Sequence, residues 1–162
     1  MRSLPWVLLI IACIPTYHYG TVLPATYELP DPRTIPAPLD SLWPAIVDVV
    51  NERQLGIKLV DKSSGLLQSE RMWAGNIDAY WDCGQIHIVK IDNVTGDSTE
   101  TVERVRPDNV MVTITLSGLP RGPSETTLRI TANVSGGCVS KGIIERELLN
   151  GIERRWTELR RP

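Results

Sequence analysis

The chain has 162 residues, of which 42% are hydrophobic and 22% charged, a balance typical of one domain that folds around a core. Its 17 basic and 19 acidic side chains give a formal net charge of −2. This balance argues against nucleic-acid binding through a basic surface and against a disordered acidic chain. Because the chain contains no Phe, aliphatic residues and Trp must fill the core.

The first residues have the pattern of an export signal. Arg2 supplies a positive charge, and residues 4–12 are all apolar. Nine apolar residues match the hydrophobic region of a signal peptide and are too few to span a bilayer as a helix. An ordinary signal peptidase needs small residues before its cut, and the nearest match, Gly20, has His18 two positions before it.

The motif Ile10-Ile11-Ala12-Cys13 resembles the lipobox of bacterial lipoproteins. The resemblance implies that residues 1–12 are removed as a signal peptide, that the sulfur of Cys13 carries a diacylglyceryl group, and that the new amino group is acylated, for example with palmitate. Two or more acyl chains give a stable membrane anchor. We therefore expect a lipoprotein of the cell envelope, anchored in the outer membrane and facing the periplasm.

Residues 13–38 are expected to form a lipidated, proline-rich tether. Six of the 12 prolines fall in this part of the chain. Proline has no N–H group and a fixed backbone angle, so this density disfavours helices and sheet ladders. We expect an extended spacer without structure of its own, with docking along the folded domain as the alternative.

Residues 39–162 are expected to form a single domain that begins with a helix. Asp40 or Ser41 can cap this helix, and Gly56 can end it. One face is apolar and consists of Trp43, Ile46, Val47 and Val50. Residues 57–61 and 66–73 follow as a predicted hairpin with Gly65 in its turn.

Alternating apolar and polar residues predict antiparallel strands at 110–116 and 127–134, and a more apolar strand at 85–91. Residues 92–109 are polar and form either a loop or a polar hairpin. A last helix is predicted after Ser140, with an apolar stripe of Ile144, Leu148, Leu149, Ile152, Trp156 and Leu159. Within it, Gly151 would permit close approach to the sheet. The arginines Arg154, Arg155, Arg160 and Arg161 suit the negative end of the helix dipole.

An antiparallel sheet with an N-terminal and a long C-terminal helix on one face is an α+β two-layer sandwich of helix-grip-like layout. Together with the lipobox and the order Trp43…Gly56-Ile57…Asp61…Gly65, this layout resembles the domains of BamC-like outer-membrane assembly lipoproteins. The resemblance implies a noncatalytic protein that binds or scaffolds another envelope component, for example in outer-membrane assembly. That family carries two such domains and this chain has room for one, so no family site is transferred.

Cys83 and Cys138 are predicted to form a disulfide, because the periplasm is oxidising. A reactive or metal-binding thiol is the alternative. Metal binding would need more ligands than His18 and His87, so neither a metal nor a cofactor is expected.

No motif indicates an enzyme. His87 lies between Ile86 and Ile88 without a paired nucleophile. Residues 92–100 lack the spacing of an EF-hand calcium loop and are interpreted as a solvated turn.

The segment 73–81 combines Trp73, Tyr80 and Trp81 with Gly, Asn and Asp. Its rings either seal the core or contact a protein partner. We predict a partner surface in which Tyr80 and at least one of the two Trp side chains are exposed.

Two other functions fit the sequence. A small-ligand or lipid binder would need an apolar cavity, lined by Trp43, Ile86, Ile88 and Trp156. A secreted eukaryotic glycoprotein would be cut near Gly20 and would carry a glycan on Asn93 or Asn133, each of which begins an Asn-X-Ser/Thr pattern.

Overall fold

The computed structural model describes residues 14–74, 77–105 and 110–161. The chain divides into two compact units. The smaller unit contains Met1–Pro24 and Cys83–Arg106, and the larger contains Ala25–Asp82 and Pro107–Pro162. This differs from the single domain expected over residues 39–162, because the strand at 85–91 pairs with the N-terminal segment and not with the main sheet.

The larger unit is built on an antiparallel sheet with the strand order β2-β10-β9-β4-β3, and β5 also pairs with β9. Its strands are β2 (Arg33–Ile35), β3 (Ile57–Asp61), β4 (Leu66–Ser69), β5 (Met72–Trp73), β9 (Met111–Pro120) and β10 (Thr126–Val134). The β3–β4 hairpin and the long β9–β10 pair confirm the strands predicted there. A short ladder joins β6 (Trp81–Asp82), which follows α3 (Ile77–Tyr80), to β11 (Val139–Ser140).

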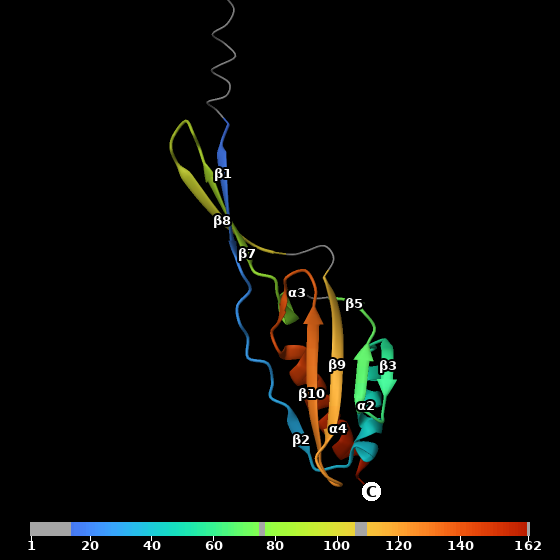
Figure 1. Ribbon diagram of the computed structural model, residues 1–162. Coiled ribbons are helices and arrows are strands. Elements are labelled where there is room, and N and C mark those ends of the chain that lie inside the picture. The colour runs from blue at the N-terminus through green and yellow to red at the C-terminus, as the bar shows by residue number, and fades with distance from the viewer. Residues whose placement is uncertain (1–13, 75–76, 106–109, 162) are drawn as a thin grey trace, which may run out of the picture. The chain divides into compact units, whose positions relative to one another are not determined.

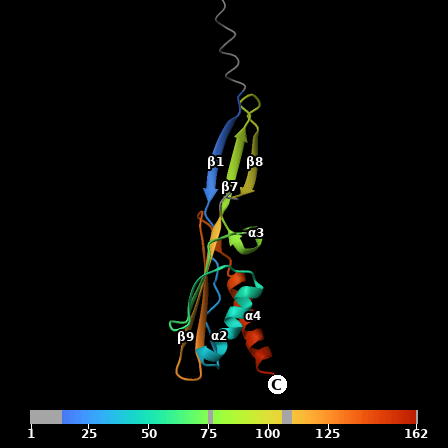
Figure 2. The same ribbon diagram turned by 90° about the vertical axis from the view of Figure 1, so that its right-hand side faces the viewer.

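Helices α2 (Leu39–Glu52) and α4 (Ile143–Leu159) lie side by side on one face of this sheet (Figures 1 and 2). The core between the two layers is aliphatic and includes Leu42, Ile46, Leu116, Leu128, Leu148, Leu149 and Ile152, all at most 2% exposed. The predicted α+β two-layer fold with its N-terminal and C-terminal helices is therefore confirmed. Within the described residues, no helix has the length and hydropathy to cross a membrane.

The beginnings of the helices differ from the predicted caps. Pro38 is the N-cap residue of α2, no side chain caps it, and Asp40 instead pairs with Lys62 at 2.7 Å. Gly142, with a φ of 73°, is the N-cap residue of α4. The Oγ of Ser140 accepts the N–H of Gly142 and donates to Glu145, so it holds the turn before the helix and does not cap it. Both predicted side-chain caps were therefore wrong: the backbone carbonyl of Pro38 accepts the N–H groups of Ser41 and Leu42 at the start of α2, and Gly142 starts α4.

Gly151 allows close approach, but to a helix. A Cβ at this position would lie 3.2 Å from Cγ1 of Val49, which is on α2. The expectation that Gly151 faces the sheet was therefore wrong, since its side of α4 meets the neighbouring helix. At Gly65 the requirement is stricter, because its φ is 68° and an added Cβ would overlap the carbonyl oxygen of Gly118.

The smaller unit is a three-stranded antiparallel sheet with the order β1-β7-β8 (Figure 1). Its strands are β1 (Thr16–Val22), β7 (Gln85–Ile91) and β8 (Ser98–Arg104). Each outer strand pairs with β7 over seven residues. The segment 92–109 therefore contains a polar hairpin strand, one of the two alternatives predicted for it.

The proline-rich segment is not the unstructured tether expected over residues 13–38. Pro15 and Pro24 flank β1 and leave residues 16–23 free of proline, with Tyr, Thr and Val side chains that favour strands. Further along, β2 docks on the edge of the main sheet against β10. Average proline density misled the prediction, because the positions of the prolines decide which short strands can form.

Candidate functional site

Helices α2 and α4 of the larger unit line an open, charged hollow of about 470 Å³. It is lined by Asp48, Asn51 and Glu52 from α2 and by Arg154, Arg155 and Glu158 from α4.

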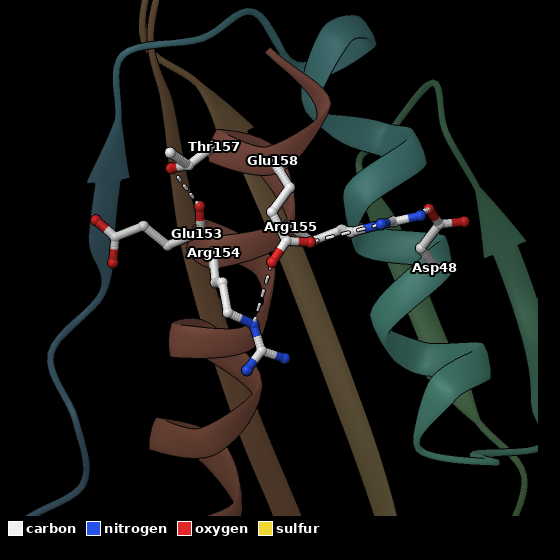
Figure 3. Close-up of polar contacts among 6 residues, drawn as sticks. All are labelled: Asp48, Glu153, Arg154, Arg155, Thr157 and Glu158. Carbon is white, nitrogen blue, oxygen red and sulfur yellow. Dashed lines mark hydrogen bonds and ion pairs between the residues drawn. The ribbon is translucent and has the colours of Figure 1, made fainter. Parts of the chain in front are cut away.

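Arg155 reaches from α4 across this hollow to α2 (Figure 3). Its Nε donates to Oδ2 of Asp48 at 3.0 Å, and its Nη2 lies 2.9 Å from the same oxygen. Its Nη1 lies 3.5 Å from Oε2 of Glu158, and Nε of Arg154 lies 3.9 Å from Oε1 of that carboxylate. The hydrogen bond to Asp48 raises the pKa of Arg155 above its usual value.

Basic and acidic side chains therefore alternate around the hollow, and the ion pair between Arg155 and Asp48 joins the two helices. Arg154 and Arg155 pair with carboxylates, and the guanidinium of Arg160 lies 5.4 Å above the ring of Trp156. The sequence suggested only a helix-dipole role for these arginines. None of the six lining residues is a Ser, Cys or His, so the hollow offers no hydroxyl or thiol nucleophile and no imidazole base.

His87 and the acidic turn lie in the smaller unit. Nδ1 of His87 is 2.9 Å from Oε1 of Glu100 on the neighbouring strand. In the turn, Oδ1 of Asp92 accepts the backbone N–H groups of Val94 and Thr95, which lowers the pKa of Asp92. Asp92 is thus the acceptor of a tight turn. Within the described ranges, no group of three or more His, Cys, Asp or Glu side chains is placed to hold a metal ion.

The cysteines stand as follows. Cys83 and Cys138 are disulfide-bonded, as predicted. Cys13, the predicted lipidation site, and the signal peptide 1–12 lie outside the described residues.

The aromatic segment 73–81 is divided between surface and core. Trp73 on β5 is 65% exposed, whereas Trp81 on β6 is 5% exposed and belongs to the core. Tyr80 is half-buried, and its ring centroid is 6.2 Å from that of Trp81. Of the three rings predicted to form a partner surface, Trp73 is freely presented, Tyr80 in part and Trp81 not at all.

The structure also shows where the residues named for the two alternative functions lie. Trp43 is in the core of the larger unit and Trp156 is half-buried on α4, whereas Ile86 and Ile88 belong to the smaller unit. The four proposed cavity residues are thus divided between the two units. The side-chain amide of Asn93 donates to the carbonyl of Ile14 at 2.6 Å and to Thr16 at 3.0 Å.

One exposed surface, the β1-β7-β8 sheet, was not predicted from the sequence. Every residue of β1 and β8 is exposed, and those of β7 are exposed or half-buried. Tyr17 and Tyr19 stack with their ring centroids 6.5 Å apart. The sequence did contain a signal for this surface, namely two tyrosines that stand two positions apart in a proline-free stretch. In a strand, this spacing places both rings on the same face.

Comparisons with known proteins do not assign a family. No family matches the chain, and no curated protein matches it. Among solved structures, the chain is similar to the Zhui aromatase/cyclase from Streptomyces sp. R1128, with 14% identity and a TM-score of 0.25 over 90% of this chain and 88% of that one. A likeness of this size carries no functional argument.

Proposed function

We propose that this protein is a noncatalytic lipoprotein of the cell envelope, cut before Cys13 and anchored there by acyl chains. In this proposal it lies in the outer membrane, faces the periplasm, and binds or scaffolds another envelope component. The observation that supports lipid attachment at Cys13 is the position of β1. This strand begins at Thr16, three positions after Cys13.

The position of β1 separates the two cleavage sites. A cut after Gly20 would remove five of the seven residues with which β1 pairs with β7. A cut before Cys13 leaves the whole strand in the mature chain. A cut that destroys a strand of the folded protein is the poorer choice, so the fold favours the lipobox over the cut required for a secreted glycoprotein.

The exposed ring of Trp73 supports the binding part of the proposal. A Trp side chain supplies a large contact area with few rotatable bonds, and Trp is enriched among the residues that dominate binding energy. Trp73 lies at the end of β5, which pairs with Met111 and Val112 of β9. The ring is therefore presented by a sheet and not by an unsupported loop.

Palmitate labelling and fractionation test the anchor. The native protein should take up labelled palmitate and sediment with membranes, whereas Cys13→Ser should lose both properties. Cys83→Ser is the matched control, since it removes another sulfur and should keep the label. A mature chain that starts at Thr21 without lipid would contradict the proposal.

Photocrosslinking in the native envelope tests the binding role. A photoreactive side chain at position 73 should capture a specific envelope protein, and Trp73→Ala should reduce recovery of that protein by native affinity purification. Leu119→Ala is the control, because Leu119 is another exposed apolar residue of the larger unit. Equal recovery with both variants would remove Trp73 from the binding surface.

A further inference from the structure

The β1-β7-β8 sheet has two faces of different character. Residues that pair directly across antiparallel strands project from the same face. By this rule Tyr17 and Tyr19 share a face with Ile86 and Ile88, since Tyr19 pairs with Ile88. We call this the tyrosine face. The opposite face carries the His87–Glu100 pair and Val102.

The tyrosine face is apolar at its centre, with one positive charge at one end and one negative charge at the other. Tyr17 is 47% exposed and Tyr19 is 71% exposed. Its two charged residues stand at opposite ends, since Lys90 pairs with Tyr17 and Glu103 pairs with Ile86. The basic end is therefore the end at which β1 begins.

The chain before β1 indicates what covers this face. Cys13 is the proposed point of lipid attachment and the first residue of the mature chain. Thr16 is three positions after Cys13, a distance of roughly 10 Å at full extension. A sheet attached this closely to an acylated residue stays within reach of the membrane surface.

We propose that the tyrosine face rests on the lipid bilayer, with Tyr17 and Tyr19 at the level of the headgroups. This inference rests on the proposed anchor at Cys13. Tyr is enriched at membrane interfaces, where its ring meets apolar lipid and its hydroxyl meets water. Lys90, at the anchored end, is attracted to anionic lipid, and Glu103 lies at the end farthest from the anchor.

The polar edges of the sheet fit this position. An open sheet edge is excluded from the hydrocarbon core, but water remains available in the headgroup region to bond its N–H and C=O groups. The sheet thus lies on the membrane and does not enter it. A sheet of this size with both faces in water would bury little apolar surface, and contact with lipid removes that deficit.

Site-directed spin labelling of the lipidated mature protein, which begins at Cys13 in this proposal, tests this contact. In that protein Cys13 is acylated and Cys83 and Cys138 are oxidised, so an introduced cysteine is the reactive thiol. Tyr19→Cys places the label on the tyrosine face, and Val102→Cys places the control on the opposite face. Both positions are more than half exposed, so the label should not disturb the fold.

In vesicles of phosphatidylethanolamine and phosphatidylglycerol, the label at position 19 should be more accessible to oxygen than to a water-soluble nickel chelate. The label at position 102 should show the reverse. Lys90→Glu should shift the label at position 19 toward the aqueous signature in these vesicles.

Each other outcome overturns the inference. If position 19 is as accessible to the chelate as position 102, the tyrosine face is in water. If position 19 is shielded from both reagents, a protein surface or a second copy covers it. In either case the protein still carries lipid and stays in the membrane, so the proposed function survives. Loss of palmitate label and of membrane association would overturn both.

Discussion

The carboxylate of Glu145 accepts a hydrogen bond from the backbone N–H of Ala132, with 3.2 Å between Oε1 and N. Glu145 lies in the first turn of α4 and is fully buried, and its other oxygen accepts the hydroxyl of Ser140 at 2.9 Å. One side chain thus joins the long helix to β10 and to the turn before the helix. A buried carboxylate is tolerated here because protein donors replace water.

We expect Glu145→Leu to lower the free energy of unfolding by about 1–3 kcal/mol, because it leaves the buried N–H of Ala132 without an acceptor. Glu147→Leu is the control, since Glu147 is only half-buried and pairs with Arg53, an interaction worth less than about 1 kcal/mol. Urea denaturation of the two variants measures the difference. Equal losses would show that the Glu145 contacts add nothing to stability.

The β3–β4 turn gives a second prediction. Gly65→Ala should destabilise the protein more than Gly122→Ala, although both positions have a φ near 70–80°. A side chain in that region costs roughly 1–2 kcal/mol at either position. Only at Gly65 does the added Cβ also overlap a carbonyl oxygen, whereas nothing lies within 4 Å of the Cβ at Gly122. Thermal unfolding of both variants is the measurement, and equal shifts of Tm would contradict the contact.

The same turn should make stability depend on pH. Hydrogen bonds from Ser63 and Ser64 lower the pKa of Asp61 from 3.8 to about 2. A depressed folded-state pKa contributes stability that is present above pH 3.8 and is lost as the pH falls toward 2. Asp61→Asn should therefore be less stable than the native protein at pH 7, and the gap should narrow between pH 4 and 2. A difference in stability that stays constant over this range would contradict the lowered pKa of Asp61.

Trp73 and Trp81 should differ in their effect on stability. Trp81→Ala removes a buried ring and should cost about 3–5 kcal/mol of unfolding free energy. Trp73→Ala removes an exposed ring and should leave Tm nearly unchanged. Differential scanning calorimetry on both variants decides the assignment, and a large loss at Trp73 would place its ring in the core.

The disulfide should stabilise the fold by restricting the unfolded chain. The bridge between Cys83 and Cys138 closes a loop of about 55 residues, for which the loop-entropy treatment gives about 4 kcal/mol. Cys138→Ser should therefore lower the midpoint of urea unfolding, and a reductant should lower the native protein to the same level. In native protein denatured without reductant, neither cysteine should react with an alkylating agent. Labelling of both would show that the bridge does not form.

The parts of the fold that bury one apolar face could be predicted from the sequence. Buried residues alternate with half-buried ones along β9 and with exposed or half-buried ones along β10 from Leu128, and the stripe on α4 contains Leu148, Leu149 and Ile152, which are buried. In these elements the buried residues recur with the period of a strand or a helix, so the spacing of apolar residues in the sequence is sufficient to identify them.

The strand at 85–91 was predicted and a hairpin after it was one of two alternatives, but β1 and its place in the smaller unit were not. Both faces of β1 and β8 are exposed, so neither strand shows the alternation that burial imposes. The pairing of β1 with β7 joins residues far apart in the chain, and no local signal reports it. The burial of Glu145 was equally hidden, because its partners Ala132 and Ser140 come from other elements. For the aromatic segment, spacing did not distinguish the exposed ring of Trp73 from the core ring of Trp81.

The place of β1 in the chain also bears on the order in which the protein folds. β1 ends at Val22, and the strand that it pairs with begins only at Gln85. During synthesis from the N-terminus, β1 thus stays unpaired until β7 has been made. If the chain is exported and lipidated as proposed, this delay would keep Cys13 accessible to modifying enzymes until β1 pairs. Closure of the sheet would then follow maturation of the N-terminus.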